Sequence, residues 1–189
     1  MANAIRMKLW RPHGEYDPAG SRFFGDPAIP AWMQEEIEED EVFLAQIRLA
    51  DVASLDTENS LPHDGWLYFF IKAEDGSAWT PKRAVVRYSK DEPQVILGEC
   101  NACSPIPEGL NDTYLVEFVT AEEADDSGMK LLGLPFDWNY ADAPPPLLLQ
   151  YDPLDSPSGF LSEMDGVVYF FVGEDAETFS DAFWHAEYS

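Results

Sequence analysis

Two cysteines with the spacing of a metal or redox motif are the first residues to consider for chemistry. Cys100 and Cys103 are the only 2 cysteines, and no second Cys-x-x-Cys pair completes the four ligands of a structural zinc ion. The 3 histidines are scattered, without His-x-x-His spacing. A redox pair normally precedes a helix, whereas Pro105 follows here. We therefore predict two reduced thiols in a turn, no bound metal and no cofactor, with a metal or redox role as the alternative.

Motifs of nucleophilic and phosphoryl chemistry are missing from the sequence. It contains no Gly-x-Ser-x-Gly, no phosphate-binding glycine loop and no cysteine followed by a histidine and aspartate arrangement. A carboxylate pair for acid–base catalysis can be hidden among the 36 Asp and Glu, because spacing along strands does not decide which side chains converge. The sequence favours a protein without catalytic residues.

The acidic residues carry the strongest functional signal. The 36 Asp and Glu stand against 11 Lys and Arg, which gives a net charge of -25. Phosphate groups repel a chain of this charge, which excludes nucleic acid and anionic membranes as direct partners. A solvated face is the ordinary interpretation of any single acidic run. Because dense like charge destabilises the compact state, we also expect a basic protein partner that neutralises part of it.

Interfaces combine aromatic anchors with a charged rim, which selects a set of candidate partner-binding residues. An acidic run holds six acids in seven positions, a second acidic cluster follows later, and two tryptophans lie near them in sequence. The candidates are Trp32, Glu35, Glu36, Glu38, Glu39, Asp40, Glu41, Glu122, Glu123, Asp125, Asp126 and Trp138.

The start of the chain and its hydropathy bear on location. No charged segment followed by an apolar one opens the sequence, and no stretch approaches the ~18 apolar residues of a membrane span. We expect a soluble, cytoplasmic protein.

An internal repeat indicates the elements that position these residues. An apolar segment that ends at Gln46, and a later Asp-Gly turn with a Tyr-Phe-Phe run at 68–70, recur at Gln150 and at 169–171. The glutamines are 104 positions apart and the aromatic runs 101, so the copies differ by three residues in one loop. Such self-similarity is typical of a duplicated supersecondary unit. We predict one domain, residues 1–189, with halves at about 21–98 and 113–189.

The segment pattern predicts an α+β fold that is mostly antiparallel β, with few short helices. The two aromatic runs are apolar on both faces and are expected to be central strands. Further strands are expected at 5–10, 83–89, 94–97, 113–119 and 182–188. A helix is expected at 31–41, and helical turns at 51–55 and 176–180.

The repeated glutamine is expected to be buried. Gln46 interrupts an apolar alternation, which places it on one face of its strand with Leu44, opposite Phe43 and Ala45. A buried amide needs hydrogen-bond partners, and we expect backbone groups of a neighbouring loop for both Gln46 and Gln150. The alternative is that the two glutamines line a pocket between the halves.

Motifs in order along the chain resemble those of the YwqG-like family, also known as DUF1963. Residues 21–30 are similar to its S-K-x-G-G-x-P-x-L-P segment, and 43–49 to F-L-A-Q-I-N-L. Residues 61–70 are similar to L-P-x-x-G-x-L-x-F-F, and 130–135 to H-x-L-L-G-Y-P. Residues 147–151 and 166–171 resemble the closing L-L-L-Q-x-D and G-x-L-Y-F-F, so the resemblance spans about 22–189. The chain departs at Met129, near the family's His, at Arg48, and at Trp32-Met33 in place of Trp-Pro.

The family has no known function, so the resemblance implies a duplicated α+β domain and no catalytic residues. Members of such families stand beside toxin genes in bacteria, which implies an immunity role. We therefore predict a non-enzymatic, acidic protein-binding domain, most concretely an immunity protein that occludes a basic toxin. An acidic mimic of DNA that blocks another basic protein fits the charge equally well. The alternative is an uncharacterised enzyme or small-molecule binder with a pocket between the repeats.

Overall fold

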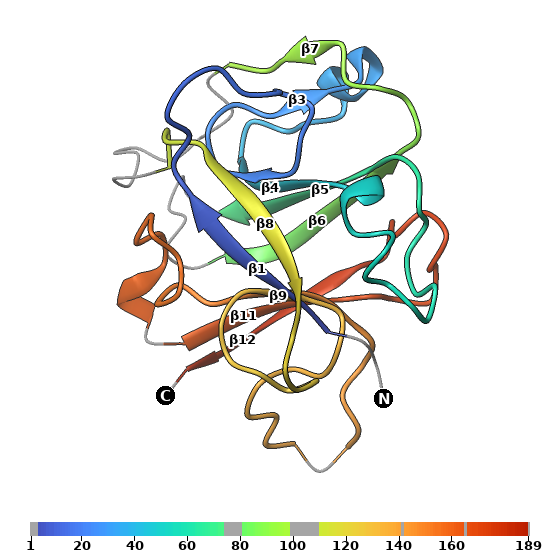
Figure 1. Ribbon diagram of the computed structural model, residues 1–189, viewed down its shortest axis with the longest axis vertical. Coiled ribbons are helices and arrows are strands. Elements are labelled where there is room, and N and C mark those ends of the chain that lie inside the picture. The colour runs from blue at the N-terminus through green and yellow to red at the C-terminus, as the bar shows by residue number, and fades with distance from the viewer. Residues whose placement is uncertain (1–3, 74–80, 99–109, 141, 165, 189) are drawn as a thin grey trace.

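A computed structural model describes residues 4–73, 81–98, 110–140, 142–164 and 166–188 (Figure 1). Within these ranges ten strands form one sheet and two form a small ribbon. The strands of the large sheet are β1 (Ile5–Trp10), β2 (Arg22–Phe23), β4 (Glu41–Arg48), β5 (Trp66–Ala73), β6 (Pro81–Ser89), β8 (Tyr114–Thr120), β9 (Lys130–Leu131), β10 (Leu147–Tyr151), β11 (Gly166–Phe171) and β12 (Phe183–Tyr188). The ribbon pairs β3 (Ala28–Ile29) with β7 (Val95–Ile96). Short 3-10 helices are η1 (Ala31–Glu35), η2 (Leu49–Asp51) and η4 (Ser162–Met164).

The large sheet curls nearly into a barrel. Its order is β12-β11-β10-β9-β1-β8-β2-β4-β5-β6, and the described pairings are antiparallel. The edge strands β6 and β12 contact each other, which shields backbone groups that an open edge would expose. Inside the curl, Phe69 of β5 meets Phe170 of β11 edge to face, with 5.3 Å between ring centroids. The predicted fold class, mostly antiparallel with few short helices, is confirmed.

The strands predicted from the sequence form, and the main helix does not. The first and last residues of each predicted strand lie within two positions of the bounds of β1, β6, β7, β8 or β12. The helix predicted at 31–41 is wrong, because η1 ends at Glu35 and β4 begins at Glu41. Lys72 and Arg87, on β5 and β6, bond the acidic side chains that follow η1 and hold that segment against the sheet. Residues 51–55 and 176–180 form turns, with Asp51 ending η2.

Strands at the two ends of the sheet have matched neighbours. The succession β6-β5-β4-β2-β8 from one edge corresponds to β12-β11-β10-β9-β1 from the other. The register also corresponds. Arg22, Gln46, Tyr68 and Arg87 form one cross-strand row, and Lys130, Gln150, Tyr169 and His185 form another. The duplication of the chain stays a prediction from the sequence repeat.

The predicted alternation of side chains along β4, with Phe43 and Ala45 on one face, is wrong because a β-bulge interrupts it. The pairing with β5 shifts between Phe43 and Ala45, which inserts one residue and reverses the alternation. Leu44 and Ala45 therefore both pack in the interior, while Phe43 packs on the outer face. β10 has a register shift at the corresponding place, between Leu147 and Leu149.

Two buried glutamines attach the surface loops to the sheet. The Gln46 Oε1 accepts the Ala28 N–H at 2.9 Å, and its Nε2 donates to the carbonyls of Pro18 and Gly20 at 3.0 and 2.9 Å. The Gln150 Oε1 accepts the Phe136 N–H at 2.9 Å. Its Nε2 donates to the carbonyls of Asp126 and Gly128 at 3.3 and 2.7 Å. The predicted backbone partners are confirmed for both side chains.

Replacing either glutamine should destabilise the protein strongly. Gln150→Leu leaves the Phe136 amide and two carbonyls without their side-chain partner, and Gln46→Leu does the same for the other set of loops. We expect each to lower the free energy of unfolding by about 3 kcal/mol or more. Gln34→Leu, at an exposed position, is the control and should stay within about 0.5 kcal/mol of the parent. Urea unfolding measures the differences, and a Gln150→Leu value near that of the control would contradict this role.

Candidate functional site

The acidic run predicted to bind a partner is largely used by the fold itself. The Lys72 ammonium lies 2.6 Å from the Glu38 carboxylate and 3.5 Å from that of Asp40. The hydrogen bond that Lys72 donates to Glu38 raises the pKa of Lys72. Glu41 is 2% exposed and receives two hydrogen bonds from the Arg87 guanidinium, at 2.8 and 3.0 Å. Part of the charge of this run is thus neutralised within the molecule.

Other members of the run remain at the surface. Glu35 and Glu39 are exposed and form no ion pair within the part of the chain that is described. The Glu36 carboxylate lies 4.0 Å from Arg87. Trp32 is 44% exposed and donates from its indole N–H to Asp91 at 3.0 Å. This end of the candidate surface therefore combines one exposed aromatic side chain with a few unpaired carboxylates.

The second acidic cluster is folded around a buried lysine. The Asp126 carboxylate accepts the backbone N–H groups of Glu122 and Glu123 at 3.1 and 3.2 Å. Lys130 is 1% exposed, and its ammonium donates to the carbonyls of Asp126 and Ala124 at 2.5 and 3.2 Å. Burial lowers the pKa of Lys130 to about 8, against the opposing effect of nearby carboxylates.

The two groups of candidate residues lie at opposite ends of the molecule. Figure 1 shows η1 at one end of the longest dimension and the loops between β8 and β10 at the other. The second acidic cluster and the Trp138 loop are neighbours, because Gln150 bonds both the Asp126 carbonyl and the Phe136 amide. The predicted set is therefore two separate surfaces.

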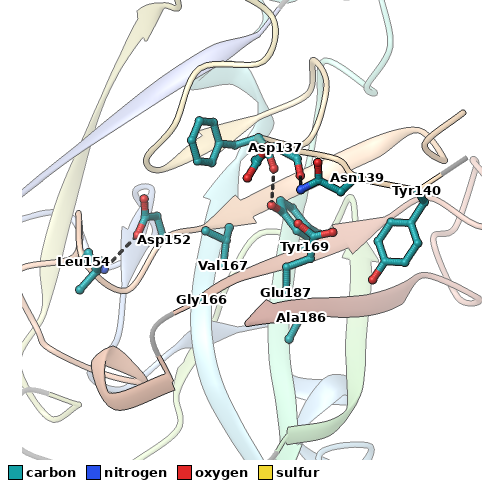
Figure 2. Close-up of a pocket in the computed structure, with 11 residues that line it drawn as sticks. Asp137, Asn139, Tyr140, Asp152, Leu154, Gly166, Val167, Tyr169, Ala186 and Glu187 are labelled. Carbon is teal, nitrogen blue, oxygen red and sulfur yellow. Dashed lines mark hydrogen bonds between the residues drawn. The ribbon is translucent and has the colours of Figure 1, made fainter. Parts of the chain in front are cut away.

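A hollow of about 710 Å³ lies beside the Trp138 loop, on the outer face of β11 and β12 (Figure 2). One wall is the loop before β10 and the other is the turn after β10, while side chains of β11 and β12 make the floor. Neither Gln46 nor Gln150 is among its lining residues. These are Phe136, Asp137, Asn139, Tyr140, Asp152, Leu154, Gly166, Val167, Tyr169, Ala186 and Glu187.

The hollow exists because the outer face of the sheet near β11 has less cover than the outer face near β5. Near β5, the ribbon of β3 and β7 and helix η1 cover the sheet, and Trp66 packs beneath them with its indole N–H donating to the Ala19 carbonyl at 2.7 Å. Val167 of β11 has the corresponding place in the repeat, two positions before Tyr169 as Trp66 is before Tyr68. A valine fills much less space than a tryptophan, so room remains above the floor.

Three carboxylates give the hollow its charge. Asp137 is exposed, Asp152 and Glu187 are half-buried, and none of them forms an ion pair among the described residues. Burial raises the pKa of Glu187, with a further increase from Asp137 that His185 opposes. Burial also raises the pKa of Tyr169, and the three carboxylates add to that increase. A cation in the hollow would relieve this repulsion.

Aromatic side chains surround the acids. Trp138 packs against Tyr140 with 4.6 Å between ring centroids, and against Phe171 at 5.5 Å. The Tyr140 hydroxyl lies 2.8 Å from the His185 Nε2. Of the nine large hydrophobic side chains that are exposed among the described residues, five lie in this region, so it is the more apolar of the two surfaces. They are Leu134, Phe136, Tyr140, Leu154 and Phe183.

Sequence reasoning selected Trp138 here and missed the acids of the hollow. Asp137 and Asp152 are isolated in sequence from the longer runs, and Glu187 lies on a strand near the end of the chain. The signal in the sequence that indicates the hollow is the difference between the two copies at one position, where the first has Trp66 and the second has Val167. Cys100 and Cys103 lie outside the described residues. Among the described residues, no group of three His, Cys, Asp or Glu is arranged to hold a metal ion.

The buried lysine should make stability depend on pH. In an unfolded chain Lys130 keeps its proton up to a pKa of 10.5, whereas the folded protein releases it near 8. Between these values the unfolded state binds more protons, so stability rises with pH. We expect the melting temperature of the parent to rise by a few degrees relative to Lys130→Met between about pH 7 and about pH 9.5, below the titration of tyrosines.

Lys90→Met is the matched control, since Lys90 is paired with Asp64 on the surface. Its melting temperature should follow that of the parent over the same range. A parent and a Lys130→Met variant with parallel pH profiles would show that Lys130 stays protonated in the fold.

Comparison with known proteins places the chain in a family. No helix in the described ranges has the length and apolar character required to cross a membrane, and the cytoplasmic location stays a prediction. The chain has no match among curated proteins. The model of a domain of unknown function (DUF1963) matches residues 21–143, which include β2 to β9 and the Trp138 wall of the hollow. Because the match covers more than half of the chain, the protein belongs to the DUF1963 family.

Proposed function

We propose that this protein is a non-enzymatic domain that binds a basic protein partner, most concretely an immunity protein that covers the cationic surface of a bacterial toxin. The observation that supports this proposal best is the difference between the two acidic surfaces. The acids of the run after η1 are partly paired with Lys72 and Arg87, whereas Asp137, Asp152 and Glu187 have no cation within the described residues. The hollow is therefore the favoured contact region.

The charge of the whole chain supports a partner of opposite sign. A net charge of -25 creates repulsion within the folded protein, and a basic surface placed against it removes part of that repulsion. Complementary charge also steers the encounter and brings association rates to about 10⁸ M⁻¹s⁻¹ or more at low salt. An inhibitor that must capture a toxin quickly benefits from this property.

Aromatic side chains support a contact at the hollow in particular. Binding energy at protein interfaces concentrates in aromatic and arginine side chains within a polar rim. Tyr140 is 51% exposed and Leu154 is 71% exposed, and both line the hollow beside its carboxylates. Trp32, at the other end, has fewer apolar neighbours at the surface. We place the main anchor at the hollow and assign the run after η1 a long-range electrostatic role.

A second candidate function is supported by the size of the hollow. Its volume of about 710 Å³ falls within the ~300–1,000 Å³ of small-molecule sites. A cationic small molecule is the ligand class that its acids favour. The gene neighbourhood separates the two proposals, since a toxin gene beside this one favours the first and a metabolic operon favours the second.

Neutralising the hollow should weaken partner binding more than neutralising the rest of the surface. The test variant is Asp137→Asn, Asp152→Asn, Glu187→Gln, and the matched control removes the same three charges by Glu35→Gln, Glu39→Gln, Glu122→Gln. The partner is first captured from the native cell and identified by mass spectrometry. We expect the test variant to bind it at least tenfold more weakly, and the control to change affinity less than about threefold.

Salt provides the second measurement. Raising it from about 0.1 M to about 1 M shortens the screening length from ~10 Å to ~3 Å, so the association rate of the parent should fall steeply. An acidic partner, or a basic one whose association rate is the same at both salt concentrations, would contradict the proposed function.

A further inference from the structure

We propose that the hollow receives the side chain of one arginine from the basic partner, with its guanidinium between Asp137 and Glu187 and its methylene groups on Val167. This inference rests on the proposed function and adds the chemical group that the site recognises. The occupant follows from charge complementarity together with the nature of the walls and floor.

The floor suits an unbranched apolar stem. Val167 of β11 and Glu187 of β12 are directly paired, so their side chains lie next to each other on the outer face. Ala186, the neighbour of Glu187 on β12, packs against the interior cluster, so it contributes backbone to the lining. Figure 2 shows Val167 and Tyr169 along the floor, with Asp137 and Asn139 on the wall above them. A side chain that enters over Leu154 or Tyr140 would thus cross apolar surface before it reaches the acids.

The walls favour a guanidinium over an ammonium. A guanidinium is planar, is weakly hydrated, stacks on aromatic rings and donates two parallel hydrogen bonds to a carboxylate. Tyr140 and Tyr169 provide aromatic faces, and the carboxylates provide acceptors on more than one side. The Tyr169 hydroxyl donates to the Phe136 carbonyl at 2.7 Å, which leaves its oxygen able to accept a further N–H.

Hydrogen bonds order the chain around two acids of the hollow without neutralising them. The Asp152 Oδ1 accepts the Leu154 N–H at 3.0 Å, and the Asn139 Nδ2 donates to the Asp137 carbonyl at 2.7 Å, which fixes the backbone around both acids. Burial and, to a smaller extent, the Asp137 carboxylate raise the pKa of Glu187, and a cation bound between the two acids offsets their repulsion. The site is thus charged and shaped before the partner arrives.

The corresponding position on β5 shows which side chain can fill the hollow without changing its charge. Trp66 occupies it and is 9% exposed. Val167→Trp therefore introduces, at the matched position of β11, a residue that the fold accommodates on β5. It removes space and leaves every charge in place, whereas Glu187→Gln removes a charge and leaves the space.

The test uses small probes and the purified full chain, so that it does not depend on finding the partner. Blocked arginine (Nα-acetyl-arginine N-methylamide) is titrated while the NMR signals of the Val167 methyl groups and the Trp138 indole N–H are recorded. Blocked citrulline has the same shape without the charge, and blocked lysine has the charge without the planar group. We expect arginine to bind with a dissociation constant of about 1 mM or lower, citrulline at least tenfold more weakly, and lysine several-fold more weakly.

The variants locate the binding. Val167→Trp and Glu187→Gln should each weaken arginine binding at least fivefold, while Glu39→Gln should leave it unchanged. Equal binding of arginine and citrulline, no shifts at Val167, or full affinity in a folded Val167→Trp variant would each overturn the proposal. Glu187→Gln gives the same decision if Val167→Trp does not fold.

The outcomes separate this inference from the proposed function. If blocked arginine binds in the hollow but no basic protein partner is captured, the arginine site stands and the proposed function fails. If the captured partner binds the Val167→Trp variant as tightly as the parent, the proposed function stands and the arginine site fails.

Discussion

The hydrogen bonding of two fully buried glutamines is the constraint on which the other features of this protein depend. Each side chain amide lies among apolar strands, where an unpaired polar group costs several kcal/mol, about 1–3 for each missing bond. Gln46 and Gln150 avoid that cost only when the neighbouring loops bring their backbone groups to the sheet. The loops of each end are therefore positioned by one side chain, and the hollow inherits its wall from the bond between Gln150 and Phe136.

The rows that contain these glutamines have the same order of residue types but different surroundings. Arg22 and Lys130 are buried beside the glutamines, and each donates to loop carbonyls. On the outer face near β5, a ribbon and a short helix complete the packing around Trp66. On the outer face near β11, a single loop with Trp138 provides the cover. Matched backbones with unequal cover leave space at one end, and that space is the candidate site.

The densest group of acidic residues in this protein is not the group whose charges are free to bind a partner. The densest acidic run lies against Lys72 and Arg87 and contributes to holding β4, β5 and β6 together. The acids of the hollow are fewer, but they are unpaired in the described structure and lie among aromatic side chains. For recognition the second arrangement is the more effective, because a partner must remove water from the charges that it contacts and gains most where apolar surface lies beside them.

The sequence alone determined the fold class, the longer strands and the backbone partners of the glutamines. These properties follow from local patterns, since alternation, turn residues and repeats act over short stretches of chain. The aromatic runs form β5 and β11, which lie second from the two edges of the sheet and not at its centre as predicted. The extent of η1, the bulge at Phe43 and the pairing of Glu41 with Arg87 were decided by tertiary contacts between strands distant in sequence. The hollow depends on the tertiary structure in the same way, because Asp137, Asp152 and Glu187 come from separate segments. The pairing of β10, β11 and β12 brings these side chains to one face.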